Sequence, residues 1–261
     1  MSKRKLVRAA TIAMLGSGLA TVLGTGAGAQ RATPEQRASP SAPAASIVTA
    51  QSGTRDIRLR IPAGECAMDR NHPADSRVVT ATERLLQNVN TLQLTTVNCR
   101  MLESWRAGRT KALTEYTQVQ TQIVPATVDH TGRERALIKA SCQAMRQHGD
   151  SVASGVTDEM ERRLAAGREK IKLAGNAFLG VLGEDQNGCY LGLLVRIVPE
   201  GSTKVVERLA IYAHVILAGR TTFLYRFSDD VSPASLARLV ADRKAAAADH
   251  VNLNGGYGTA L

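Results

Sequence analysis

Three polar side chains that can carry acid–base chemistry lie close together in one apolar segment of the sequence. Residues 204–218 alternate as a β-strand does, so Arg208, Tyr212 and His214 fall on one face while apolar residues take the other positions. Such a group could transfer protons if a pocket joined it to a carboxylate, as a small hydrolase or lyase would require. A structural role, with this face lightly solvated or packed beneath a helix, explains the same residues and is favoured.

Motifs for other kinds of catalysis or for metal binding are missing from the sequence. No Cys-x-x-Cys pair, no metal-spaced histidine pair and no Gly-x-Ser-x-Gly elbow occurs, so we expect neither a metal nor a cofactor. The loop 68–75 gathers two carboxylates, an arginine and a histidine, which could hold a ligand. Turn and helix-cap chemistry accounts for the same residues and is the preferred interpretation.

The first 29 residues have the pattern of a cleaved secretory signal peptide. Four basic residues within 1–8 precede an uncharged apolar run over 9–24, and Ala27-Gly28-Ala29 fits a signal-peptidase site with cleavage after Ala29. The apolar run is too short, and too rich in Gly, Ser and Thr, to serve as a bilayer-spanning anchor. We therefore expect a periplasmic or secreted protein with no transmembrane segment after signal cleavage.

Removal of the signal also changes the charge of the protein. The formal net charge of the 261 residues is +10; the signal carries four of the 33 basic residues and none of the 23 acidic ones, so the mature chain has +6. This modest charge, together with export, argues against nucleic-acid binding. Anionic envelope components, such as phospholipid headgroups or acidic glycans, or an envelope protein are the expected partners.

The four cysteines, Cys66, Cys99, Cys142 and Cys189, all lie in the exported part of the chain, which predicts two disulfides. Three pairings are possible. We favour Cys66 with Cys99 and Cys142 with Cys189, because each pair joins neighbouring segments of the expected strand and helix order. In the chain-entropy model each bridge would contribute about 3–4 kcal/mol to stability.

The remaining sequence predicts one α+β domain over 56–250, after a disordered Pro/Ala/Ser-rich tether at 30–55 and before a flexible tail at 251–261. Period-2 and period-3.6 patterns locate its elements. Strands are expected at 56–62, 91–97, 113–123, 178–182, 189–198, 204–218 and 221–227; helices are expected at 78–86, 101–105 and 233–250, with two more in 132–173 separated by a break at 149–155. We expect a mixed, largely antiparallel sheet covered by helices.

Several short segments carry a resemblance to a known group of proteins. They are IPAGECAMDR (61–70), TTVNC (95–99), ESWRAGR (103–109), GCYLGLL (188–194) and AHVILAGRTTFLYRF (213–227). With the final hairpin and helix they resemble exported proteins of proteobacteria that are similar in pattern to the PsbP-like α-β-α sandwich. The resemblance covers 56–250 and implies an α-β-α sandwich, but no reaction.

The sequence thus predicts a non-catalytic binding or accessory module of the cell envelope. The alternative is a periplasmic hydrolase or lyase that uses the Arg208, Tyr212 and His214 face. A third possibility is an assembly partner that uses the Pro-rich tether and a basic face.

Overall fold

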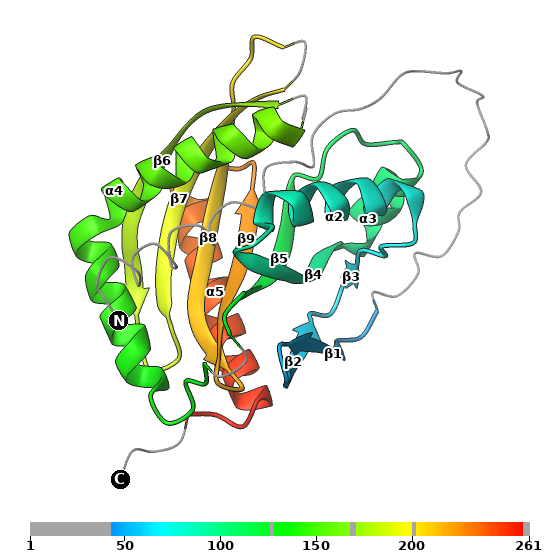
Figure 1. Ribbon diagram of the computed structural model, residues 1–261. Helices are drawn as coiled ribbons and strands as arrows, with labels where there is room; N and C mark the ends of the chain where they lie inside the picture. Colours follow the sequence, from blue (N-terminus) through cyan, green and yellow to red (C-terminus); the bar gives the residue numbers. More distant parts are fainter. Residues whose placement is uncertain (1–42, 126–127, 168–170, 200–201, 258–261) are drawn as a thin grey trace.

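The computed structural model describes residues 43–125, 128–167, 171–199 and 202–257. In this part of the chain, seven strands form one sheet in the order β3-β4-β5-β9-β8-β7-β6, with helices on both sides (Figure 1). The strands are β3 (Glu65–Ala67), β4 (Asn90–Asn98), β5 (Glu115–Gln122), β6 (Ile171–Glu184), β7 (Cys189–Pro199), β8 (Val206–Leu217) and β9 (Arg220–Ser228). The helices are α2 (Pro73–Leu86), α3 (Cys99–Arg106), α4 (Glu134–Gly167) and α5 (Pro233–Leu253). The fold class is α+β, as predicted, and all six pairings within the sheet are antiparallel rather than mixed.

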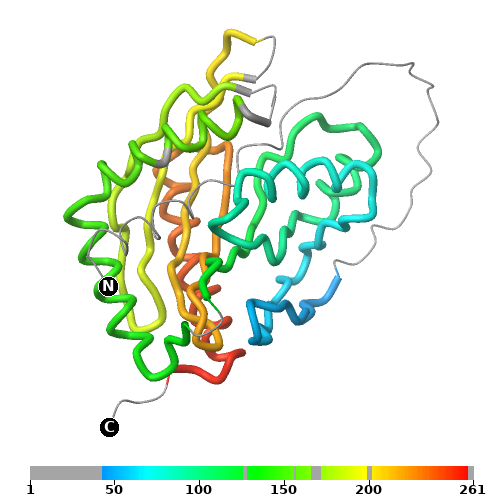
Figure 2. Tube along the Cα trace, viewed as in Figure 1, coloured from blue at the N-terminus to red at the C-terminus, as the bar shows by residue number. Residues whose placement is uncertain are grey.

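The sheet separates two layers. Helices α2, α3 and α4 cover one side, which we call the α4 face, and α5 covers the other, which we call the α5 face (Figure 1). Two further strands, β1 (Ser46–Ser52) and β2 (Arg55–Ile61), form a separate hairpin beside the C-terminal part of α5 (Figure 2). None of the helices in the described ranges is long and apolar enough to cross a membrane.

Strand alternation divides the apolar side chains between the two faces. Along β8, Ala210 and Tyr212 point into the core beneath α4, whereas Leu209 and Ile211 pack against Leu239 of α5. Nearly every residue of β8 and β9 is buried, because helices cover both sides of these central strands. The segment 204–218, for which the sequence predicts a polar face, therefore lies in the centre of the protein.

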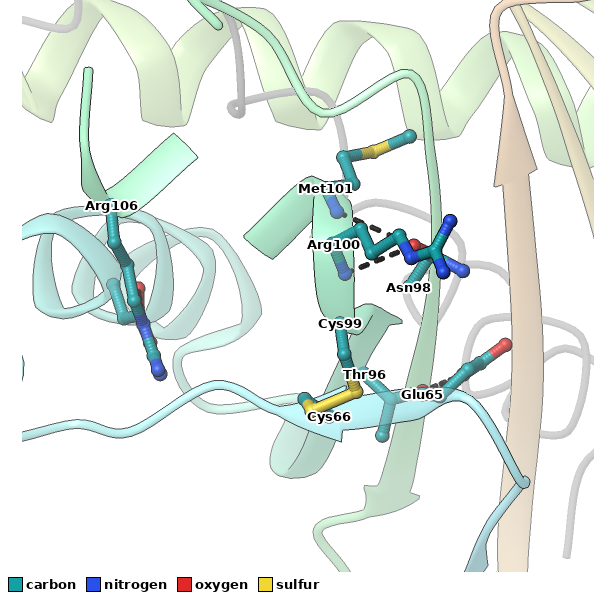
Figure 3. Close-up of a disulfide and its surroundings, with 9 residues drawn as sticks. Glu65, Cys66, Thr96, Asn98, Cys99, Arg100, Met101 and Arg106 are labelled. Carbon is teal, nitrogen blue, oxygen red and sulfur yellow. Dashed lines mark hydrogen bonds and ion pairs between the residues drawn. A yellow bond between two sulfur atoms is a disulfide. The ribbon is translucent and has the colours of Figure 1, made fainter. Parts of the chain in front are cut away.

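Both predicted disulfides are present. Cys66 on β3 is bonded to Cys99 at the start of α3, where Asn98 caps the helix by accepting hydrogen bonds from two backbone N–H groups (Figure 3). Cys142 on α4 is bonded to Cys189 on β7. No free cysteine remains in the described residues. The second bridge attaches α4 covalently to the sheet.

The predicted tether is too long at its C-terminal end. Residues 46–52 form β1 instead of remaining disordered to residue 55. The chain turns at Gly53, whose φ of 62° suits glycine, and then pairs β1 with β2. Val48 and Ala50 pack against the core of the α5 face, which gives this polar-looking segment enough apolar contact to order. The predicted signal peptide and residues 30–42 of the tether lie outside the described residues.

The predicted break at 149–155 is wrong, since α4 is one helix of 34 residues. The glycine that indicates a break, Gly149, instead allows close packing on β6. A Cβ at this position would lie 1.9 Å from a ring carbon of Phe178, so only glycine fits without rearrangement. Beyond the expected break, Thr157 donates its hydroxyl proton to the carbonyl of Ala153, as a residue inside a continuous helix can.

The C-terminal segment is also more ordered than the predicted tail at 251–261. Helix α5 continues to Leu253, and the hydroxyl of Tyr257 accepts a hydrogen bond from the N–H of Ile216 and donates one to the carbonyl of Asn187. Tyr257 thereby satisfies a backbone group of β8 just beyond the end of its pairing with β7. Residues 258–261 lie outside the described part.

Candidate functional site

The three residues singled out in the sequence all point to the α4 face from β8, but they do not form one site. Arg208 and His214 are six residues apart on an extended strand, which places their Cα atoms about 20 Å apart. Tyr212 lies between them. A reacting group a few ångströms across could not contact both ends, so the three side chains have to be considered separately.

All three nitrogens of the Arg208 guanidinium group donate hydrogen bonds to neighbouring residues. Only 1% of its side chain is exposed, and its Nε donates to Asp229 at 2.5 Å. Its two terminal nitrogens donate to the hydroxyl of Tyr116 and the carbonyl of Leu113, both at 3.3 Å, and its guanidinium lies over the Tyr116 ring. Burial alone would lower the pKa of Arg208, but Tyr116 and the ion pair with Asp229 outweigh burial and raise it. Arg208 is a paired, permanently charged structural group.

Tyr212 belongs to a series of packed rings that crosses three strands. The order of contact is Tyr116, Phe227, Tyr225, Tyr212, Phe223 and His214, with ring centroids 4.7–6.2 Å apart between neighbours. These distances are typical of stacked and edge-to-face aromatic pairs. Burial raises the pKa of Tyr212 far above its ordinary value, so its hydroxyl stays protonated at neutral pH. The Tyr212 ring contributes to the hydrophobic core, and its protonated hydroxyl group does not act as a general base.

His214 attaches α4 to the sheet. Its Nδ1 is 2.9 Å from the hydroxyl oxygen of Ser141 on α4, and its neighbour across the strand pair is Cys189, which carries the disulfide to Cys142. Burial, with a smaller contribution from His130, lowers the pKa of His214 to about 4. His214 is therefore neutral at pH 7, and within the described residues its Nε2 has no hydrogen-bond partner.

The contact between Ser141 and His214 has the composition of a nucleophile and a base, yet it lacks the other parts of such a site. No carboxylate orients His214 among its described contacts, and Ser141 lies inside α4, where backbone N–H groups are already bonded within the helix. The backbone N–H groups around this serine are thus not free to bind an oxyanion. Sequence reasoning did not find Ser141; the signal in the sequence was its position next to Cys142, which forms the predicted bridge to Cys189.

The loop 68–75 uses its polar residues for local structure. His72 is the N-cap of α2 and accepts a hydrogen bond from the N–H of Ala74, while the carboxylate of Asp75 is buried and paired with Arg106. The His72 cap is the chemistry favoured from the sequence, whereas the ion pair of Asp75 is a long-range contact with α3. Within the described residues, no group of three or more His, Cys, Asp or Glu side chains is arranged to hold a metal ion.

The α5 face contains an ionic cluster that sequence reasoning missed. It consists of Glu65, Glu115, Arg226, Arg238 and Arg243, which we call the α5-face cluster. Arg226 pairs with both glutamates, and Arg238 pairs with Glu115 at 2.7 Å. Burial alone would raise the pKa of Glu115, but hydrogen bonds from Arg238 and Arg226 outweigh it and lower that pKa. The sequence signal for this cluster was Arg226, a charged residue within the otherwise apolar and aromatic run 223–227 of β9.

The fold and these sites define a class: a disulfide-stabilised α+β domain whose antiparallel sheet is enclosed between helices on both faces. No protein-family model matches the chain, and no curated protein matches it either. The relationship to exported PsbP-like proteins therefore stays a prediction based on the sequence segments given above.

Proposed function

We propose that this protein is an exported, non-catalytic binding or accessory module of the cell envelope. The observation that carries the proposal is the pairing of all four cysteines in two disulfides. Disulfides persist in oxidising compartments such as the periplasm and are rare in the cytosol. The N-terminal sequence, with its basic start, apolar run and Ala27-Gly28-Ala29, supports the same location.

The proposed absence of catalysis is supported by the use of the candidate residues. Arg208 is held by Asp229 and Tyr116, Tyr212 packs between other rings, and His214 contacts Ser141 without a carboxylate. The hydrolase or lyase alternative is weaker, because it needs these groups around one substrate.

Export and oxidation are tested together by intact mass and thiol labelling. The full chain is expressed in a bacterial host, and the envelope fraction is alkylated under denaturing, non-reducing conditions. We expect the mass of a chain that begins at Gln30, with no alkylated cysteine. A version that lacks residues 1–29 and stays in the cytosol is the control, in which reactive thiols should appear. Four free thiols in the envelope fraction, or an unprocessed chain, would contradict the proposal.

The alternative is tested with chromogenic esters, amides, glycosides and phosphates as substrates. We expect no turnover above that of buffer. Turnover that is lost in His214→Asn and kept in His148→Asn, an exposed position on the same helix as Ser141, would support the hydrolase instead.

A further inference from the structure

Arg243 is a buried arginine on the face of the sheet opposite the candidate residues discussed above. It comes from α5, points toward β9, and is only 5% exposed. Its one hydrogen bond within the described part of the chain runs from Nη1 to the carbonyl of Tyr225 at 3.4 Å, near the upper limit for such a bond. Its Nε is buried and has no partner among the described residues.

The carboxylates near Arg243 are occupied by other arginines. Glu65 accepts from Arg226 and from the hydroxyl of Thr96, and both oxygens of Glu115 accept from Arg238. Within the described part of the chain, no carboxylate forms an ion pair with Arg243 itself. With Asp242, which pairs with Arg238 at 3.4 Å, three guanidinium groups and three carboxylates meet here, and Arg243 is the guanidinium that no described carboxylate reaches directly.

An unpaired buried cation is unfavourable by several kcal/mol in general, so proteins rarely keep one without a counter-charge. Burial, with repulsion from Arg226, lowers the pKa of Arg243 to about 10. The guanidinium is still charged at pH 7, so loss of its proton does not remove the problem. A bound anion would supply a counter-charge in direct contact with Arg243 and an acceptor for its Nε.

We propose that Arg243 holds a small oxyanion group of a ligand beneath α5, an inference that rests on the binding role proposed above. A guanidinium presents several N–H groups in one plane and matches the paired oxygens of a phosphate or a carboxylate. The cluster reaches the surface at Arg238, whose side chain is 46% exposed. In this proposal the anionic group enters there, between α5 and the start of β5, and this site is where an anionic envelope component is recognised.

The test uses the mature, oxidised protein and inorganic phosphate, at constant ionic strength maintained with chloride. We expect the unfolding temperature to rise with the logarithm of the phosphate concentration above Kd, by on the order of 5 °C at a hundredfold excess over Kd. Isothermal titration should give one site per chain. A parallel series with acetate separates the sources: a response to phosphate alone indicates a phosphate-bearing ligand, and a response to acetate alone indicates a carboxylate.

Two neighbouring substitutions give a matched comparison. Arg243→Met removes the buried charge, and Lys244→Met removes an equal charge from the adjacent, exposed position. We expect the phosphate response to be lost in Arg243→Met and kept in Lys244→Met. Should Arg243→Met fail to fold, Arg243→Gln replaces it, and the stoichiometry measured on the wild-type protein still decides.

Two results would overturn the site. One is the lack of both a thermal shift and a saturable titration of the wild-type protein with phosphate or acetate; the other is an equal response in Arg243→Met, which would place the anion elsewhere. Neither result affects the mass and thiol measurements, so the site can fail while the exported binding role stands. Conversely, a cytosolic, reduced protein that still binds phosphate through Arg243 would remove the envelope role and keep the site.

Discussion

Two buried arginines, one on each face of the sheet, have opposite surroundings. Arg208 on the α4 face has an ion pair, a hydroxyl and a carbonyl acceptor, and an aromatic ring beneath it. Arg243 on the α5 face has one long bond to a carbonyl. The pKa of Arg208 is raised although burial opposes it, whereas burial lowers the pKa of Arg243. Two arginine side chains that are buried to a similar extent thus differ in how completely the protein provides them with partners.

The difference indicates which of the two buried arginines is fully partnered and which can still accept a ligand. Around Arg208 the α4 face is satisfied, and a disulfide fixes α4 to the sheet beside the contact of His214 with Ser141. In the described ranges the α5 face has no disulfide, and the Nε of its buried Arg243 has no hydrogen-bond partner. We therefore regard the α4 face as the structural support and the α5 face as the binding face.

The largest expected effect comes from removing the covalent link of the α4 face. Cys142→Ala with Cys189→Ala opens a loop of 47 residues in sequence separation, which should lower the free energy of unfolding by about 4 kcal/mol in the chain-entropy model. Urea denaturation checks this. The phosphate response of the α5 face should persist at temperatures where the variant is folded. A stability loss below about 1 kcal/mol would show that non-covalent contacts alone hold α4 in place.

The next effect comes from making Arg208 resemble Arg243. Asp229→Asn removes the counter-charge of Arg208 and keeps the size of the side chain. Loss of one partner from a buried ion pair costs about 3–5 kcal/mol, and we expect the lower end because Asp229 is partly exposed. Asp242→Asn is the control, since its pair with Arg238 lies at the surface and should contribute less than about 1 kcal/mol. Equal losses in the two variants would remove the distinction between the faces.

Acid should weaken the α4 face through His214. The pKa of His214 is about 4 in the folded protein and lies near 6.5 in an unfolded chain, so the unfolded state binds the proton more tightly. Stability is therefore complete above pH 6.5 and falls as the pH drops toward 4, with about 2 kcal/mol lost at pH 5. His130 and His250 also have lowered pKa values and act in the same direction.

Denaturation curves at pH 7.5 and pH 5 for the wild type and His214→Gln separate these contributions. The pH-dependent loss should become smaller in the variant, whatever its stability at pH 7.5. An unchanged pH dependence would mean that His214 is already accessible to protons in the folded state.

The sequence made the α4 face easier to predict than the α5 face. Export and an even cysteine count predicted two disulfides, and period-2 alternation placed Arg208, Tyr212 and His214 on one side of β8. Local patterns could not show that Asp229 reaches Arg208, or that Glu65 and Glu115 meet Arg226, because these pairs join residues 21 to 161 positions apart. The same limit applies to Gly149, whose role depends on Phe178 in another element.

Arg243→Met should have the smallest effect on stability when no anion is added. This variant also tests the difference between the two buried arginines most directly. Methionine fills a similar volume and removes an unpaired buried charge, so the free energy of unfolding in chloride buffer should stay equal or rise by about 1 kcal/mol. Arg208→Met serves as the reference and should destabilise the protein, because it leaves Asp229 and the Tyr116 hydroxyl without their donor. Urea denaturation of both variants, with and without phosphate, measures the two effects. Clear destabilisation by Arg243→Met in the anion-free protein would mean that Arg243 is as structural as Arg208, because its charge would then already be compensated inside the fold.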